Sequence, residues 1–587
     1  MNTIPSLFFQ KSEIYKNKTL FGFKNNKKWD HITWNESKDM VINLSLGLDK
    51  IGIKKNDKVS IISDNSYQWC VADLAIMSLG GVTVPGYISS NEDELYHILS
   101  HSESSLIFTN AKLLHTILKI IPKLKKIKSI VCFDPFEEKN YSKQNIEILS
   151  FNELRKIGSN SVLKKDFLNL YVNKLKAEDV ICLIYTSGTS SLPKGVMLTH
   201  KSIITNIEGA ELLVRDINVK YHRFLSIIPL SHAYEHTAGF LLPLYIGADI
   251  YFNKNRDHIV DDLLTVKPTL MVAVPRLYEV LYKKINNQLL YQNKISQKLF
   301  LKAVELGIKK FQYSNLNLLE KLIDIFLTIT VRKKIKNKFG GKLQTFISGG
   351  AALNIQVGLF FNALGINILQ GYGQTECSPL ISANPINRVK LDSVGLVIKG
   401  LEVKLSKENE ILVKGNSVMK GYWKDEINTK KTIVNGWLHT GDLGSIDEDN
   451  YIKIIGRINE MIVNSGGENI APVPIENSLL SYDEVEQVMV YGNNKPFLIA
   501  IIVPNDELIY KADGDIKSLH HIFQEILTSV NKKLSQNKKI RKFILTAKSF
   551  NFENNQLTPT LKIKRHIIIK DYKDKVSNLY KKHISKK

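Results

Sequence analysis

The sequence has few cysteines, and no two of them are close together. The four cysteines form no C-x-x-C pair: Cys70, Cys132, Cys182 and Cys377. This spacing argues against a zinc site and against a disulfide framework. A reducing compartment fits such cysteine usage best, so we expect a cytoplasmic protein.

Long apolar runs are also missing. The most apolar stretch, residues 240–252, is too short for a membrane-spanning helix and contains Pro243 and Asp249. The first residues show no basic segment followed by a long apolar core, so we expect no secretory signal. The sequence therefore predicts no membrane-spanning segment.

The chain is strongly basic, but the positive charge is not concentrated in one segment. It has 80 Lys and Arg against 57 Asp and Glu, a net charge of +23 spread over 587 residues. Such a spread indicates a compositional bias, so we predict no nucleic-acid partner. A hydrophobic content of 44% is ample for several buried cores.

Short apolar runs alternate with helical patterns from about residue 50 onward. The predicted strands are 58–63, 82–87, 105–110, 129–133, 224–230, 248–252 and 270–275. The predicted helices between the first of these strands are 66–80, 91–102 and one from about residue 112. Continuous apolar strands separated by helices indicate βαβ units and a mostly parallel sheet covered on both faces.

Two later regions differ from this pattern. Residues 278–338 read as helical, apolar and basic, which fits either packing on the domain or peripheral contact with a membrane surface. After residue 400 short β-like segments follow, and a Gly-Arg pair near 456–459 interrupts the apolar pattern. We therefore predict an α/β protein with a large N-terminal region, 1–458, of layered, mostly parallel sheets covered by helices, and a small α+β C-terminal domain, 459–587.

A loop rich in hydroxyl groups follows the apolar run at 180–184. It reads YTSGTSSLPKG over residues 185–195 and differs from the P-loop template because Pro193 precedes Lys194 and Gly195 follows it. Proline has no N–H to donate to a phosphate, and glycine offers no hydroxyl to Mg²⁺. The loop fits either a polar surface turn or an anion site built from hydroxyls, backbone N–H groups and the lysine.

This loop resembles the signature loop of the adenylate-forming superfamily of AMP-producing acyl-CoA synthetases, YTSGTTGxPKG. Ser190 and Ser191 stand where threonine and glycine are usual. The resemblance implies a catalytic role for Thr186 and nucleotide binding by the loop. The loop residues so implied are Thr186, Ser187, Gly188, Thr189, Ser190 and Lys194.

Other motifs resemble the same family, in the same order along the chain. QGYGQTE implies Tyr372 against the adenine, Thr375 at the α-phosphate and Glu376 as the catalytic ligand of Mg²⁺, which prefers hard oxygen ligands. GWLHTGDLG implies that Asp442 binds the ribose, with Arg457 of the hinge motif GRINEMI near it. The further nucleotide or coenzyme residues implied by these and the SGGAAL and SGGENI segments are Gly349, Gly350, Ala351, Gly371, Gly373 and Gly467.

The C-terminal motif LTPTLKIKR resembles the segment that carries the family's catalytic lysine, here Lys562. The segments IIPLSHAYEHTAG and VAVPRLYEVLYKKI resemble long-chain fatty acyl-CoA synthetases and imply that His232 lies beside the acyl and nucleotide site. The resemblance implies activation of a long-chain fatty acid by Mg-ATP to acyl-AMP, then transfer to coenzyme A. It also implies that the C-terminal domain is mobile and rotates between the two steps.

Three alternatives stay open at this point. The acyl acceptor is acyl carrier protein in some relatives, and the first half-reaction would be identical. A P-loop phosphotransferase is a second alternative, against which Pro193 and Gly195 argue. A basic, non-catalytic protein that binds nucleic acid or anionic lipid is the third, and its affinity would depend steeply on salt. No oligomeric state is predicted.

Overall fold

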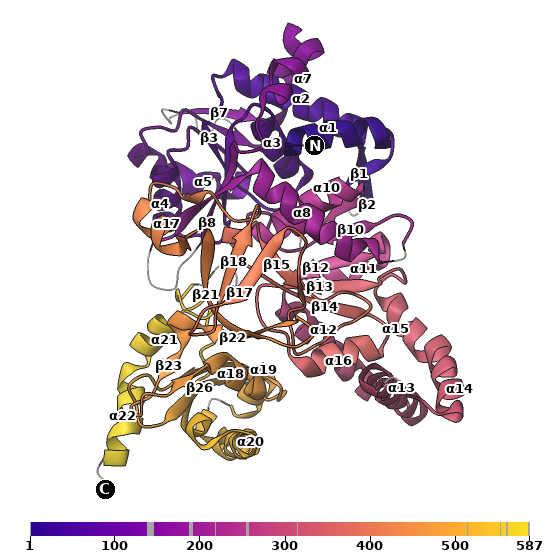
Figure 1. Ribbon diagram of the computed structural model, residues 1–587, viewed down its shortest axis with the longest axis vertical. Coiled ribbons are helices and arrows are strands. Elements are labelled where there is room, and N and C mark those ends of the chain that lie inside the picture. The colour runs from indigo at the N-terminus through magenta and orange to yellow at the C-terminus, as the bar shows by residue number, and fades with distance from the viewer. Residues whose placement is uncertain are drawn as a thin grey trace.

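Two large sheets, both mostly parallel, form the centre of the N-terminal part of the protein (Figure 1). The computed structural model describes residues 2–26, 28–137, 146–186, 192–217, 219–253, 258–313, 315–513, 515–551, 553–558 and 562–584. Within these ranges the strands of the first sheet, in spatial order, are β16 (Leu396–Val397), β15 (Leu380–Ala383), β14 (Asn367–Gly373), β13 (Thr345–Ser348), β12 (Leu270–Ala273), β10 (Arg223–Ser226), β11 (Asp249–Phe252), β1 (Thr19–Asn25) and β2 (Lys28–Thr33).

The second sheet contains the strands predicted from the first part of the sequence. Its described strands, in spatial order, are β19 (Gly421–Tyr422), β9 (Lys194–Thr199), β8 (Val180–Thr186), β4 (Val82–Gly86), β3 (Lys58–Ile62), β5 (Leu106–Thr109), β6 (Ser129–Cys132) and β7 (Glu147–Ser150). The pairs from β8 to β7 are parallel, whereas β9 pairs antiparallel with both β8 and β19. The predicted α/β class with mostly parallel sheets is confirmed.

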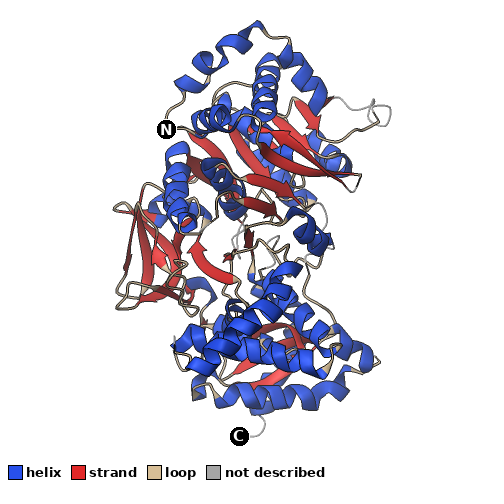
Figure 2. Cartoon of the chain, turned by 90° about the vertical axis from the view of Figure 1, so that its right-hand side faces the viewer, coloured by secondary structure: helices blue, strands red, loops and turns tan. Residues whose placement is uncertain are grey.

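Helices pack on the faces of these sheets (Figure 2). Those of the first half are α1 (Ile4–Tyr15), α2 (Trp34–Lys50), α3 (Tyr67–Ser78), α4 (Glu92–Ser102), α5 (Ala111–Ile120), α6 (Phe151–Ser159), α7 (Phe167–Leu170), α8 (His200–Arg215), α9 (Ala233–Glu235), α10 (Leu242–Ile246) and α11 (Ile259–Val266). Helix α3 is buried on all sides from Trp69 to Ser78, as expected of a helix that is apolar all round, and packs against β1, β3 and β4. It therefore joins the two sheets.

The region 278–338 is helical as predicted, but it is divided into separate helices. These and their neighbours are α12 (Pro275–Leu290), α13 (Lys294–Tyr313), α14 (Leu318–Leu327), the π-helical turn η7 (Thr328–Arg332), α15 (Lys333–Lys338), α16 (Ile355–Ala363) and α17 (Glu426–Thr432). Helix α14 begins at a capping box, in which Asn317 accepts from the N–H of Glu320 while the Glu320 carboxylate accepts from the N–H of Asn317. This cap explains the break before α14.

After residue 400 the chain forms an antiparallel sheet and then a smaller unit. The antiparallel sheet consists of β17 (Leu401–Leu405), β18 (Glu410–Gly415), β20 (Ile433–Val434), β21 (Trp437–Ile446) and β22 (Ile452–Arg457). The smaller unit contains β23 (Ile462–Val463), β24 (Asn469–Ile470), α18 (Pro472–Leu480), β25 (Val485–Tyr491), β26 (Leu498–Pro504), α19 (Asp506–Lys511), α20 (His520–Lys532), β27 (Ile540–Leu545), α21 (Arg565–Asp571) and α22 (Lys573–Ile584).

The buried apolar residues form separate cores. One cluster joins the two large sheets and the antiparallel sheet, and includes Val59, Phe224 and Ile411. The clusters around β25, β26 and β27 contain only residues from 462 onward. Among the described residues, no core cluster includes side chains from both sides of residue 458, which supports the predicted boundary at 458/459; that boundary stays a prediction.

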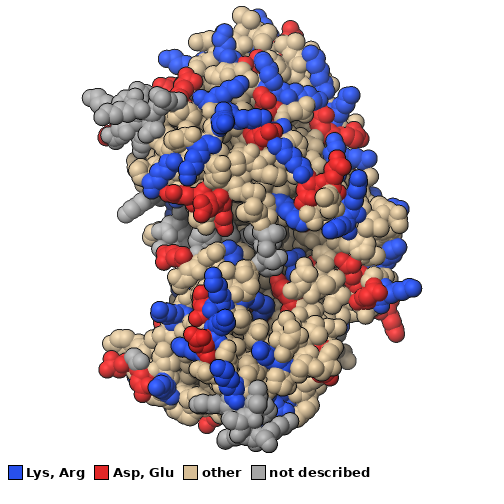
Figure 3. All heavy atoms as spheres, turned by 90° about the vertical axis from the view of Figure 1, so that its left-hand side faces the viewer, with Lys and Arg blue, Asp and Glu red and all other residues tan. Residues whose placement is uncertain are grey.

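Two surface properties bear on the sequence expectations. On the face shown in Figure 3, Lys and Arg side chains are scattered over both the upper and lower parts, among Asp and Glu. No helix in the part of the chain that the structure describes has the length and hydropathy needed to cross a bilayer.

Candidate active site

A chain of hydrogen bonds joins β14 to the antiparallel sheet. The Tyr372 hydroxyl donates to Asp442 Oδ2 over 2.7 Å, and Arg457 Nε donates to Asp442 Oδ1 over 2.8 Å. Asp442 and Arg457 are register partners on β21 and β22, which explains why residues 15 positions apart meet. Burial, and then the Asp442 carboxylate, hold the pKa of Tyr372 well above its usual range. Three residues predicted at the nucleotide site therefore lie together.

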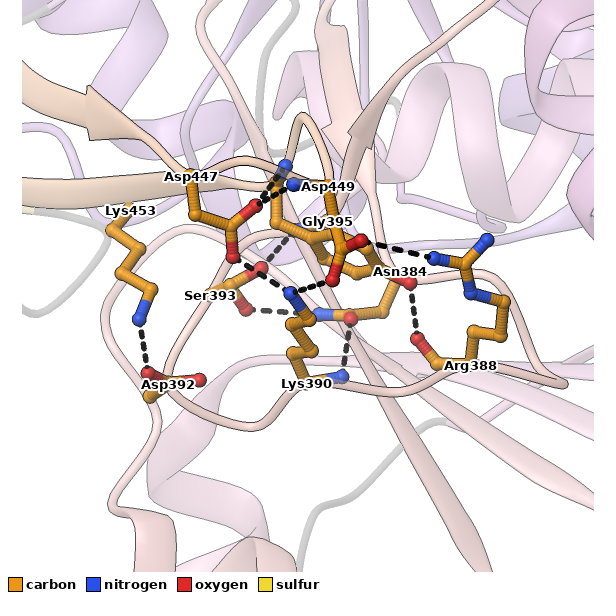
Figure 4. A network of polar contacts seen from close by, with 10 residues as sticks. Asn384, Arg388, Lys390, Asp392, Ser393, Gly395, Asp447, Asp449 and Lys453 are labelled. Atoms are coloured by element: carbon orange, nitrogen blue, oxygen red, sulfur yellow. Dashed lines mark hydrogen bonds and ion pairs between the residues drawn. The ribbon is translucent and has the colours of Figure 1, made fainter.

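A polar network fixes the turn between β21 and β22 (Figure 4). The Lys390 ammonium lies 2.7 Å from both the Asp447 and the Asp449 carboxylates, and Lys453 pairs with Asp392 over 2.5 Å. These pairs tie the segment around residues 384–395 to the hairpin. They position the hairpin that carries Asp442 and Arg457.

The tight turn after β14 carries Thr375 and Glu376. It is the short helix η8 (Thr375–Cys377), and Gly373 just before it approaches the chain so closely that a Cβ there would lie 2.1 Å from the Pro379 carbonyl oxygen. From α8, the Asn206 amide donates to the carbonyls of Cys377 and Leu380 over 2.9 and 2.7 Å. This buried amide holds the turn in place.

The Glu376 carboxylate lines a pocket of about 230 Å³. The Tyr422 hydroxyl donates to Glu376 Oε1 over 2.9 Å, and the Lys194 ammonium lies 5.1 Å from the centre of the Tyr422 ring. The other residues lining this pocket are Gln374, Glu410, Lys431, Thr432, His439, Thr440 and Gly441. The lysine of the hydroxyl-rich loop and the predicted magnesium ligand thus face one tyrosine.

The ends of the hydroxyl-rich loop are fixed in an antiparallel hairpin. Thr186 on β8 and Lys194 on β9 are register partners. From α4, His97 Nε2 lies 2.9 Å from the carbonyl oxygen of Pro193, and His101 Nδ1 lies 2.9 Å from the Tyr185 hydroxyl. A P-loop would lead from a strand into a helix, so the hairpin argues further against a phosphotransferase. The predicted residues Ser187, Gly188, Thr189 and Ser190 lie outside the described residues.

His232 precedes the short helix α9. Its Nδ1 accepts from the Tyr234 N–H over 3.1 Å, and burial, followed by the charge of Lys562, lowers its pKa to about 4. The Tyr234 hydroxyl donates to the Ile347 carbonyl, and its ring lies so close to Gly349 that a Cβ there would be 2.9 Å from it. His232 is therefore a neutral imidazole at physiological pH, near Lys562.

The predicted glycine segments are divided between the site and the surface. Gly349 lies under Tyr234, and Gly371 lies on β14 beside Tyr372. Gly350 and Ala351 follow β13 and are exposed. Gly467 lies in the exposed turn between β23 and β24, where a Cβ would have no neighbour within 4 Å. Its role at the coenzyme site stays a prediction.

Lys562, from the smaller unit, lies near residues of the large one. Its pKa is lowered by burial first and by the charge of Arg457 second, while Asp442, Glu460 and Glu376 act in the opposite direction. The residue also keeps solvent-exposed surface. Lys562 therefore shares one electrostatic environment with the predicted ribose and magnesium residues.

The segment around Lys562 is held by hydrogen bonds and one buried ion pair. The Lys562 N–H donates to the Thr558 hydroxyl, and the Thr558 N–H donates to the Lys562 carbonyl, over 3.0 and 2.8 Å. The Arg565 guanidinium donates two hydrogen bonds to both oxygens of Glu476 on α18, over 2.5 and 2.7 Å. Such a two-pronged pair fixes direction as well as distance, so Lys562 is anchored to its own unit.

Two ion pairs hold the smaller unit against the large one. Arg276 on α12 pairs with Glu486 on β25, and Lys564 lies 3.9 Å from Glu94 on α4. Both pairs place the face carrying Lys562 toward the site.

The residues present fit a magnesium ion bound mainly through substrate. Among the described residues, no group of three or more His, Cys, Asp and Glu side chains is arranged to hold a metal by itself. Mg²⁺ usually keeps several waters and binds one or two carboxylates plus substrate phosphates. The half-buried Glu376 carboxylate at the pocket provides such a ligand.

Sequence reasoning missed Tyr422 and Asn206. Tyr422 is 46 residues from its partner Glu376, and Asn206 is 171 residues from Cys377. Helix α8 was not among the predicted helices, and its one amide, Asn206, is buried and therefore needs hydrogen-bond partners. No sequence signal marks Tyr422.

A buried acidic cluster lies behind His232. Glu235 is 1% exposed and its Oε1 accepts from the Ser226 hydroxyl over 2.6 Å. Nearby, His236 Nε2 lies 2.8 Å from Asp73 Oδ2, both side chains being fully buried, and the His236 ring packs edge-on against Trp69. Burial raises the pKa of Glu235 to about 8. A neutral carboxyl group thus supports the segment that carries His232.

Comparison with known proteins identifies relatives along nearly the whole chain. The family model described as AMP-binding enzyme matches residues 8–423, and that described as AMP-binding enzyme C-terminal domain matches residues 459–584. The long-chain-fatty-acid–CoA ligase FadD15 of Mycobacterium bovis is 28% identical, over 94% of this chain and 93% of the relative. The long-chain-fatty-acid–CoA ligase ACSBG2 of Rattus norvegicus is 30% identical, over 98% and 93%.

Solved structures show the same fold. The adenylation domain of the carboxylate reductase of Mycobacterium chelonae superposes with a TM-score of 0.77 at 19% identity, covering 98% of this chain and 91% of that one. At this identity the likeness establishes the fold.

The raised pKa of Glu235 predicts a pH-dependent stability. Because the folded protein holds this proton up to about pH 8 and the unfolded chain releases it near 4.5, the contribution is fully present below about 4.5 and is lost as the pH rises toward 8. We expect Glu235→Gln to remove this dependence, and the exposed Glu426→Gln to keep it. Denaturant midpoints measured at both ends of this range test the prediction; equal pH slopes for Glu235→Gln and the unmutated protein would contradict it.

Proposed function

This chain belongs to the AMP-binding enzyme family, and from that premise we propose that it is a long-chain fatty acid–CoA ligase that forms AMP. It would activate a fatty acid with ATP to acyl-AMP and pyrophosphate, then pass the acyl group to coenzyme A. The observation that carries this proposal is the convergence of Lys562, Asp442 and Glu376, three groups from distant parts of the sequence, in one electrostatic environment. The similarity to the long-chain-fatty-acid–CoA ligases FadD15 and ACSBG2 supports the choice of a long acyl chain.

Adenylation brings the fatty-acid carboxylate onto the α-phosphate, so two anions must approach each other. Fixed positive charge lowers the cost of this approach, and it acts most strongly where water is excluded. Lys562 and Lys194 would supply this charge from opposite sides, one from the C-terminal unit and one from the end of the hydroxyl-rich loop. Thr186, at the end of β8 opposite Lys194, and Thr375, on η8, would offer hydroxyls to the phosphate oxygens.

The nucleoside would lie against the Tyr372, Asp442 and Arg457 chain. Asp442 accepts one hydrogen bond from Tyr372 through Oδ2 and one from Arg457 through Oδ1. Each carboxylate oxygen has a second lone pair, which could accept a hydrogen bond from a ribose hydroxyl. The Arg457 side chain donates to Oδ1 and so fixes the orientation of the carboxylate. The ring of Tyr372 would lie beside the base.

Mg²⁺ would be held by Glu376 together with the phosphates of ATP, and it would supply charge neutralisation there. Tyr422 donates to one oxygen of Glu376, and the Glu376 side chain lines the pocket. Tyr422 thereby orients the carboxylate, as groups behind a metal ligand commonly do.

Thioester formation would need a different placement of the C-terminal unit. Gly467 is exposed in the present arrangement, and the coenzyme role implied for it requires the β23–β24 turn to come to the site. A rotation of the C-terminal unit about Asn459, on the exposed segment between β22 and β23, would move Lys562 out of the site and bring the β23–β24 turn into it.

Acyl carrier protein is the alternative acceptor. The first half-reaction would be identical, so the choice rests on the names of the relatives, which are CoA ligases. We also propose that the protein is located in the cytoplasm.

Replacing Lys562 should separate the two half-reactions. We expect Lys562→Ala to slow acyl-adenylate formation by about 10²- to 10³-fold, the usual cost of removing one group that stabilises developing charge. Transfer from supplied acyl-adenylate to coenzyme A should be largely retained, because Lys562 has left the site by then. Pyrophosphate release and thioester formation, measured separately, test this division. The matched control is Lys570→Ala, because Lys570 is an exposed lysine on α21. Equal loss of both half-reactions in Lys562→Ala would refute the proposed division of labour.

Replacing Glu376 should weaken the dependence on magnesium. We expect Glu376→Gln to raise the magnesium concentration needed for half-maximal turnover by roughly tenfold or more, because a neutral amide is a poorer ligand. Magnesium titrations of AMP production test this, with the exposed Glu408→Gln as control. An unchanged titration would exclude Glu376 as the ligand.

A matrix of acyl substrates and acceptors tests the proposed activity itself. AMP production should be highest with long-chain fatty acids and should require coenzyme A for multiple turnovers. Higher activity with short or aromatic acids would contradict the long-chain proposal. Acceptance of acyl carrier protein without coenzyme A would replace the proposed acceptor.

A further inference from the structure

Helix α14 and the turn η7 are apolar on two opposite faces. One face packs inward, where Ile323, Leu327 and Val331 contact the cluster formed with α13. The other face is an apolar stripe that points into solvent, with side chains 53–81% exposed. We call the following residues the outer stripe: Leu318, Leu319, Leu322, Ile325, Phe326 and Ile329.

The outer stripe is continuous along the helix. Successive members are one or three residues apart, and alternate ones are often four apart, so they share one side of the helix. Over twelve positions at 1.5 Å per residue the stripe is about 17 Å long. A helix that only covers a core needs one apolar face, so the outer stripe is not explained by packing within the chain.

The acidic side chains of α14 point away from the outer stripe. Glu320 pairs with Lys309 of α13 over 2.6 Å, and Asp324 pairs with Lys310 and with Arg332. Both carboxylates are thereby directed toward α13. The outer side of the helix is left without negative charge from these two residues.

Lysines lie beside and beyond the stripe. Lys321 lies between stripe residues, and Lys333 and Lys334 follow directly after η7. All three are exposed, and none of them has a carboxylate partner within the described part of the chain. The surface therefore combines apolar side chains with unpaired positive charge.

The position of the helix matches a role in docking. In Figure 1, α13 and α14 project from the lower right of the molecule, and α14 is the outermost element there. The projecting face is a convex single helix rather than a groove. Such a shape suits a flat, deformable partner.

We propose that α14 and η7 dock the protein on an anionic lipid bilayer, with the helix lying in the plane of the interface and the outer stripe inserted among the acyl chains. The three lysines would contact anionic headgroups, each raising the affinity for such a surface by roughly fivefold. Amphipathic helices with this division of apolar and basic groups bind interfaces in this way. The proposal does not depend on the proposed reaction.

A second copy of the chain suits this surface less well. In a twofold contact each stripe would meet the same stripe, which would bring the lysines of both copies together. The two acids of α14 are already paired with α13 and could not offset this charge. Anionic headgroups offset it directly.

Vesicle co-sedimentation of the full-length protein tests the proposal. We expect binding to phosphatidylcholine vesicles that contain phosphatidylglycerol, and much weaker binding to phosphatidylcholine alone. The triple variant L322S/I325S/F326S should bind at least about tenfold more weakly, since each inserted side chain contributes one or more kcal/mol. K333Q/K334Q should lose roughly tenfold or more on anionic vesicles only.

Controls separate docking from folding and from self-association. The triple variant V162S/I427S/Y510S removes equally exposed apolar side chains from other elements and should bind like the unmutated protein. All variants should keep the same thermal midpoint, because the replaced side chains are exposed. No binding to either vesicle, equal loss in the control triple variant, or a stripe variant that becomes monomeric while vesicle binding is unchanged would overturn the proposal.

Discussion

The Asp442 carboxylate is the constraint on which the site depends. Through one oxygen it holds the Tyr372 hydroxyl and through the other the Arg457 guanidinium, so it links a strand of the first large sheet to the antiparallel sheet. A carboxyl group buried to 4% exposure needs such hydrogen-bond partners, because an unpaired buried polar group is costly. The position of Arg457 in turn sets the electrostatic environment of Lys562. The Asp442 side chain thereby connects Tyr372, through Arg457, to the environment of Lys562.

The strand and helix pattern could be predicted because it is local. Buried parallel strands such as β3 and β5 are continuous apolar runs, and helices such as α4 begin at recognisable caps. The division of the region 278–338 into several helices was not predicted. It depends on the Asn317 capping box and on the ion pairs between α13 and α14, which no periodicity reveals.

The candidate site was predictable where a motif carries the residue, and not where a contact joins distant segments. Glu376 and Asp442 belong to short motifs, so the resemblance of those motifs to a family implied a role for each. Tyr422 and Asn206 act through partners far along the chain, and only the folded sheets bring them together. His97 and His101 likewise support the hydroxyl-rich loop from a helix that carries no motif.

The contact between the two units has an energetic consequence for the catalytic cycle. The described ion pairs across it join partly exposed side chains, and such pairs each contribute about 1 kcal/mol or less. Because each unit keeps its apolar core to itself, separation exposes no core surface to water. Separation of the two units therefore costs little beyond the loss of these ion pairs.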